Sequence, residues 1–152
     1  MKGRKAHFWS FVAYCALMVW LLFGRERIAA PHGYWQQVAQ NINPWPFQTI
    51  TMFVDFLVKD YSDGLKRHAI VNLVGNVIMF VPLGYFTAAL WKGFRPLWRC
   101  LLRSGLIIVC VELVQLFALV GSCDFDDLML NLVGVGLGYG LYRLVQSRKN
   151  KG

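Results

Sequence analysis

The stretch AIVNLVGNVIMFVPLGYFTAALW, residues 69–91, decides the fold class of this chain. It is long enough to cross a bilayer, because a spanning helix needs about 20 mostly apolar residues. Runs of the same character lie at 8–23, 101–120 and 128–145, each bounded by charged or turn residues. The 152 residues are 57% hydrophobic and 16% charged, with a mean hydropathy of +0.44, which excludes an ordinary soluble domain. The sequence therefore predicts an all-α integral membrane protein, a single domain over residues 1–152 with four transmembrane helices.

The placement of charge predicts the orientation of these helices. Eleven of the 16 lysines and arginines fall on the side of the membrane that holds both chain ends. Every acidic residue except Glu112, which lies within a span, falls on the opposite side. Cytoplasmic segments retain positive residues, so we expect both ends in the cytoplasm, an N-in/C-in arrangement. The net charge of +8 then reflects topology and a preference for anionic lipids. Nucleic acid binding is not predicted, because the positive residues are scattered over short loops.

The segments around the first span have their own signals. Charges at 25–27 separate the first apolar run from small residues, which favours an uncleaved anchor over a signal peptide. In the loop after it, Pro44 and Pro46 flank Trp45 and exclude a helix, and the tryptophan predicts an anchor at the membrane interface. The apolar residues 50–58 are too few to span, so we expect an interfacial or re-entrant helix there.

Polar side chains interrupt two of the spans at helical spacing. Asn72 and Asn76 are four residues apart and share a helix face, as do Glu112 and Gln115, three apart. Hydrogen bonding between helices is one explanation for the asparagines. An ionisable group at membrane depth is a functional candidate by default, which favours a functional role for Glu112. The alternative is a structural, protonated carboxyl that is hydrogen-bonded to Gln115 or Asn76.

Three acids, Asp124, Asp126 and Asp127, stand where the chain enters its last span, followed by Asn131. Asp124 could cap that helix, and the helix dipole favours a second acid nearby. Three acids together suggest a cation, a proton or a cationic ligand group, and a divalent cation at Asp124 and Asp127 is one form of this hypothesis. No other cofactor is predicted, because the chain has no zinc-type cysteine spacing and no histidine cluster.

Glycines in the last span form two pairs with small-x-x-x-small spacing, Gly134 with Gly138 and Gly136 with Gly140. Such pairs let another helix approach closely. We expect one pair to receive a neighbouring helix, and the other to face lipid, a second subunit or a cavity. A homodimer is therefore left open.

The order of these motifs resembles the VanZ-like family. The matching motifs are Asn43-x-x-Pro46-Phe47, Asn72-x-x-x-Asn76-x-x-x-Phe80-x-Pro82-x-Gly84, Glu112-x-x-Gln115 and Asp124-x-x-Asp127-x-x-x-Asn131-x-x-Gly134, over residues 43–142. That family consists of small bacterial membrane proteins associated with low-level resistance to the lipoglycopeptide teicoplanin. The resemblance implies a phenotype rather than a reaction, and a multi-pass location in the bacterial cytoplasmic (inner) membrane. The residues it carries over are Asn76, Pro82, Glu112, Gln115, Asp124, Asp127 and Asn131.

Together, motifs and resemblance predict a polar pocket near the outer interface. Its predicted members are Asn72, Asn76, Glu112, Gln115, Asp124, Asp127 and Asn131, with Arg67 and His68 as anion contacts. In the leading hypothesis the protein binds or handles an amphiphile at the outer leaflet. The amphiphile would be a lipid-linked cell-wall intermediate or the lipoglycopeptide. Membrane lipids are its other expected partners. Because carboxylates repel phosphate, a phosphate-bearing ligand would need the two cations or a bridging Mg²⁺ ion.

Two alternatives belong to other functional classes. One is a membrane-embedded enzyme acting on a lipid headgroup, with Glu112 or Asp127 as acid, base or metal ligand. The chain offers no obvious nucleophile, so the sequence leans away from an enzyme. The other is a small proton-coupled flippase or transporter, which a buried Glu112 would suit.

Overall fold

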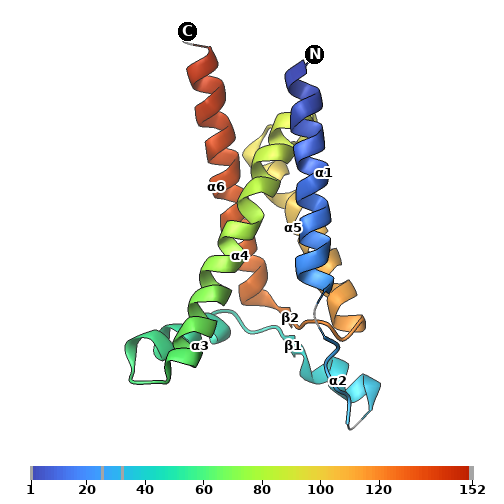
Figure 1. The fold of residues 1–152 in the computed structure, drawn as a ribbon, viewed down its shortest axis with the longest axis vertical. Coiled ribbons are helices and arrows are strands. Elements are labelled where there is room, and N and C mark those ends of the chain that lie inside the picture. The colour runs from blue at the N-terminus through green and yellow to red at the C-terminus, as the bar shows by residue number, and fades with distance from the viewer. Residues whose placement is uncertain (1, 25, 32, 151–152) are drawn as a thin grey trace.

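Four long helices form the body of the protein. The computed structural model describes residues 2–24, 26–31 and 33–150, so residue 25 of the charged cluster lies outside the described residues. The long helices are α1 (Lys2–Phe23), α4 (Asp63–Leu90), α5 (Leu97–Phe117) and α6 (Phe125–Lys149). Each is long and apolar enough to cross a membrane, which confirms the predicted number of spans within the described residues. The two described ends of the chain lie at the same end of the bundle (Figure 1), and the cytoplasmic location of that end stays a prediction from charge.

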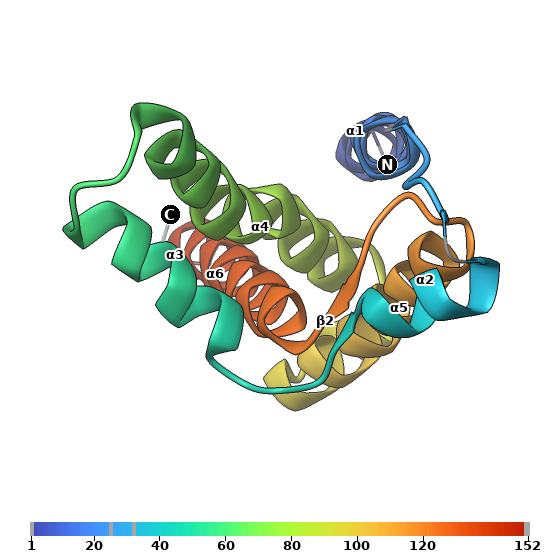
Figure 2. The same cartoon turned by 90° about the horizontal axis from the view of Figure 1, so that it is seen from below.

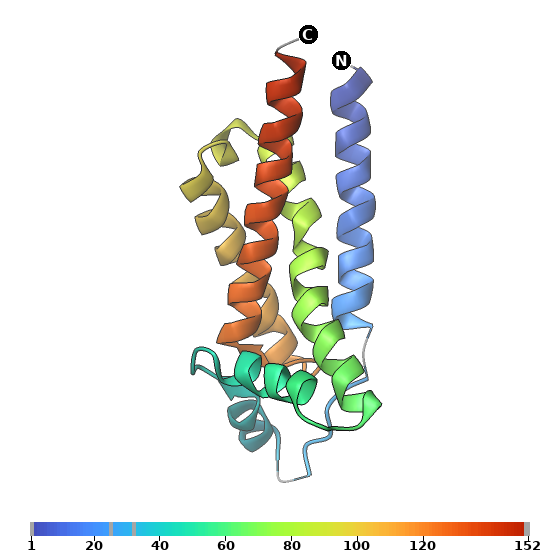
Figure 3. The ribbon, with the colours of Figure 1, turned by 90° about the vertical axis from the view of Figure 1, so that its left-hand side faces the viewer.

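Short elements gather at the opposite end of the bundle. They are α2 (Tyr34–Gln40), β1 (Ile42–Asn43), α3 (Gln48–Val58) and β2 (Cys123–Asp124), while η1 (Lys92–Phe94) joins α4 to α5. Helix α3 contains the predicted apolar segment 50–58 and lies crosswise to the long helices, against α4 and α6 (Figures 2 and 3). Strands β1 and β2 pair in parallel over two residues each, which the all-α expectation did not include. A strand of two residues has no hydropathy period from which it could be predicted.

The ends of the helices differ from the ends of the spans predicted from the apolar runs. Helix α4 begins at Asp63, six residues before the predicted span, because backbone hydrogen bonding continues into the polar sequence before it. Helix α5 ends at Phe117 instead of 120, since Leu119 has a left-handed φ of 54°. The Val120 amide then donates to the Gln115 carbonyl and closes the helix end.

Helices α4 and α6 form the most extensive helix pair, and glycines set their distance. A Cβ added at Gly84, Gly134 or Gly138 would overlap a backbone carbonyl oxygen of the facing helix, whereas one at Gly136 or Gly140 would meet nothing within 4 Å. This confirms that one glycine pair receives a neighbouring helix and leaves the other open. Helix α1 packs more loosely, and its Tyr14 hydroxyl donates to the Met79 carbonyl of α4 at 2.9 Å.

Candidate functional site

A polar cavity of about 600 Å³ lies at the end of the bundle that carries α3 and the two strands. All seven polar residues of the predicted pocket line it, together with His68. They come from α4, α5, β2 and α6, and the connection after α1 adds Glu26 and Asn41 to the wall. Glu112, Gln115, Asp124 and Asn131 are all buried. The fold thus brings the seven predicted polar residues, which are up to 59 positions apart in sequence, around one cavity.

Asp124 holds two segments at the rim of this cavity. Its Oδ1 accepts a hydrogen bond from the Asp126 amide at 2.8 Å, which confirms the predicted cap of α6. Its Oδ2 accepts from the Thr49 hydroxyl at 2.5 Å and from the Asn43 amide at 3.2 Å. One carboxylate therefore starts α6 and also fixes the loop that precedes α3.

Asp126 has a structural role and is not part of the cavity lining. It is fully buried, and its two oxygens accept hydrogen bonds from the backbone amides of Phe47, at 2.5 Å, and Ile50, at 3.0 Å. These amides lie at the start of α3, where the helix dipole favours a negative charge. The argument that three acids suggest a cation, a proton or a cationic ligand group counted Asp126 as available, whereas both of its oxygens already accept hydrogen bonds. The described residues also contain no group of three His, Cys, Asp or Glu that could hold a metal ion.

The two asparagines of α4 and Asp127 form a polar chain along one wall. The Asn76 amide donates to Asn72 Oδ1 at 3.2 Å and to Asp127 Oδ1 at 2.6 Å. The second bond joins α4 to α6, so hydrogen bonding between helices is confirmed for Asn76. Gln115 lies apart from this chain, and its amide donates to the Leu22 carbonyl of α1 at 2.9 Å.

Glu112 has little hydrogen bonding in the wall of the cavity. Its Oε1 is buried without a hydrogen-bond partner among the described residues, and its Oε2 has a long contact, 4.0 Å, with the Cys123 thiol. The expected bond to Gln115 or Asn76 is not formed, because both amides donate elsewhere. Asn131 Oδ1 and Asn41 Nδ2 are also buried and unpaired within the described part of the chain. An unpaired buried polar group costs about 1–3 kcal/mol, so three around one cavity indicate a place for a polar ligand.

Acidic side chains dominate the charged groups of the lining. Glu26, Glu112, Asp124 and Asp127 belong to it, and His68 is its only basic residue among those described. Arg67 is exposed and outside the lining, because neighbouring residues on a helix point about 100° apart. The structure therefore does not place Arg67 as an anion contact of this cavity.

Some residues of the lining lay beyond the sequence prediction. Asn41 and Thr49 are single polar residues in a connecting segment, and nothing in their local pattern sets them apart from ordinary loop residues. Their place in the wall depends on contacts with β2, whose residues are far away in sequence. The Asn41 carbonyl, for example, accepts a hydrogen bond from the Cys123 amide at 2.9 Å.

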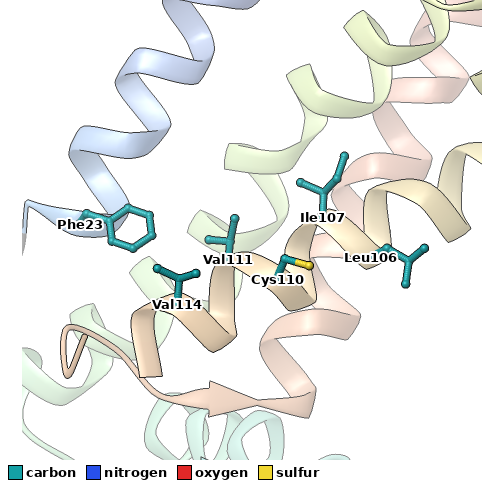
Figure 4. Close-up of a pocket in the computed structure, with 6 residues that line it drawn as sticks. All are labelled: Phe23, Leu106, Ile107, Cys110, Val111 and Val114. Carbon is teal, nitrogen blue, oxygen red and sulfur yellow. The ribbon is translucent and has the colours of Figure 1, made fainter. Parts of the chain in front are cut away.

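An apolar groove of about 350 Å³ adjoins the polar cavity. Figure 4 shows the residues that line this groove. Phe23 at the end of α1 forms one side, and the other side is a face of α5. That face consists of Leu106, Ile107, Cys110, Val111 and Val114. Val111 lines both the groove and the cavity. The polar cavity and the apolar groove therefore meet at Val111.

Comparison with known proteins identifies the family. The model of the VanZ/LLP1 family matches residues 11–146. The chain is 30% identical over 116 residues to the uncharacterized membrane protein YwnJ of Bacillus subtilis (strain 168), covering 76% of each chain. It is 32% identical over 82 residues to Protein VanZ of Enterococcus faecium, covering 53% of this chain and 49% of that one. There is no significant match among solved structures. Because the family match covers most of the sequence, this chain belongs to the VanZ/LLP1 family of membrane proteins.

Proposed function

We propose that this protein binds an amphiphile, with the polar part in the cavity and the alkyl part against the groove, and thereby contributes to resistance to teicoplanin-type glycopeptides. The observation that carries the proposal is the wall shared by the two spaces at Val111. An amphiphile is the class of molecule that needs polar and apolar surfaces side by side. Family membership and the similarity to Protein VanZ support the link to resistance.

The size and lining of the cavity suit a head group. Ligand pockets usually have volumes of about 300–1,000 Å³, and this one has about 600 Å³. Glu112 and Asn131 offer buried oxygens that a bound polar group would satisfy. If the orientation predicted from charge holds, the cavity faces the outer leaflet, where lipid-linked cell-envelope molecules and the lipoglycopeptide both occur.

Drug susceptibility in cells tests the proposal. A sensitive Gram-positive host would express the wild type, Glu112→Gln or Asp127→Asn at matched membrane levels. Asp55→Asn is the matched control, because Asp55 forms an exposed ion pair with Lys59 and lies outside the cavity lining. We expect the wild type and the control to raise the inhibitory concentration of teicoplanin, and the two cavity variants to lose that protection.

Vancomycin, which lacks the long fatty chain of a lipoglycopeptide, serves as the comparison drug. The proposal predicts a smaller effect on vancomycin than on teicoplanin, since only the latter is amphiphilic. A wild type that protects against neither drug would contradict the resistance function. Full protection by Glu112→Gln and by Asp127→Asn would contradict the role of the cavity.

A further inference from the structure

We infer that the cavity selects a primary ammonium group as the head of its amphiphile; this inference deepens the proposed function and rests on it. The starting point is the kind of atom left unpaired. Glu112 Oε1 and Asn131 Oδ1 are both hydrogen-bond acceptors, and their side chains are 7% and 5% exposed. A ligand that satisfies them must donate hydrogen bonds, and a primary ammonium has three N–H donors.

The negative charge of the cavity lining also favours a positively charged head group. A buried carboxylate is stable only if it is paired, so the best partner for Glu112 is a cation that also donates hydrogen bonds. Asp124 and Asp127 lie in the same lining and add to the negative potential there. The cavity therefore offers an ammonium group hydrogen-bond acceptors and negative charge in a space partly shielded from water.

Other head groups fit these residues less well. A phosphate would bring a second negative charge beside Glu112 and Asp124, with His68 as the only basic residue of the described lining. Sugar hydroxyls would supply hydrogen bonds but no opposite charge. A quaternary ammonium would supply the charge but no N–H donor. Of these head groups, the primary ammonium alone provides both positive charge and N–H donors.

The same chemistry can come from a membrane lipid or from a soluble amine. The apolar groove beside Val111 favours a ligand with an alkyl chain, because burial of each CH₂ group contributes about 0.8 kcal/mol. The experiment therefore compares head groups on a chain of fixed length, and includes one amine without a chain.

Thermal unfolding of the full chain in phosphatidylcholine nanodiscs provides the test, since a ligand that binds the folded state raises its unfolding temperature. The probes are dodecylammonium, dodecyltrimethylammonium, dodecyl phosphate, dodecyl maltoside and ethylammonium. We expect dodecylammonium to stabilise the wild type at a concentration about tenfold or more below the other dodecyl probes, a difference of about 1.4 kcal/mol. Ethylammonium should require much more, and equal potency would identify a soluble amine as the source of the ammonium group.

Three variants separate the cavity from general effects on the bilayer. Glu112→Gln should remove the preference for dodecylammonium, and Asn131→Ala should weaken it if Glu112→Gln proves too unstable to assay. Asp55→Asn should retain it. Stabilisation by dodecyl phosphate or dodecyl maltoside as strong as that by dodecylammonium would overturn the head-group assignment and leave amphiphile binding intact. Absence of stabilisation by every probe would contradict amphiphile binding itself.

Discussion

The contact between α4 and α6 yields the sharpest prediction, through Gly138→Ala. The added Cβ would overlap the Val81 carbonyl oxygen and lie 2.9 Å from the Tyr85 amide nitrogen. Real Cβ atoms essentially never come within 3.0 Å of another atom, and these neighbours are backbone, which cannot rotate away. The two helices must therefore separate by about an ångström, and such overpacking costs about 1–3 kcal/mol.

Gly136→Ala is the matched control on the same helix, because its Cβ would meet nothing within 4 Å. Alanine favours a helix over glycine by about 1 kcal/mol, and this gain is common to both variants and cancels in their difference. We expect Gly138→Ala to be less stable than Gly136→Ala by about 1–3 kcal/mol. The free energy of unfolding is measured by titration with SDS in mixed micelles, followed by helical circular dichroism. Equal stability of the two variants would refute the assigned helix contact.

Four more predictions concern the cavity and the segments around it. Asp126→Ala should reduce the free energy of unfolding by about 1–3 kcal/mol, because it leaves two amides at the start of α3 unpaired; an unchanged value in the same SDS titration would contradict this cap. Val111→Trp should abolish teicoplanin protection, because the larger side chain would fill space in the groove and the cavity, while Leu113→Trp, at an exposed position of α5, should not; equal protection by both would count against the groove. An impermeant maleimide should label the partly exposed Cys123 without permeabilisation, and labelling of Cys123 only after permeabilisation would show the opposite orientation. Burial raises the pKa of the Cys123 thiol, so its thiolate is scarce at neutral pH and its labelling rate should climb from pH 7 to pH 9.

The features that the sequence predicted best depend on the spacing of residues close together in the chain. The length and hydropathy of the apolar runs were enough for four spans, and the spacing of Asn72 and Asn76 placed both on one face, where Asn76 donates to Asn72. Asp124 was predicted as a helix cap, because capping residues lie directly before the helix that they cap. These features involve residues at most a few positions apart.

Pairings between distant residues could not be predicted in the same way. Asp126 looks like an acid beside Asp124 and Asp127, yet its partners are amides 76 and 79 residues earlier. Gln115 has the right spacing to act with Glu112, but its amide bonds to a carbonyl of α1, 93 residues away. Local spacing shows which residues share a face, and only the packed fold shows which of them already have partners.

The dependence of α3 on Asp126 also has a consequence for the order of biosynthesis. The amides at the start of α3 precede their carboxylate partner by more than 70 residues in the chain. At synthesis rates of about 5–20 residues per second, several seconds or more pass between the two. During that time the amides of Phe47 and Ile50 lack the carboxylate that accepts their hydrogen bonds. The polar site, which also needs Asp127 and Asn131 of α6, is therefore completed only when the last helix is in place.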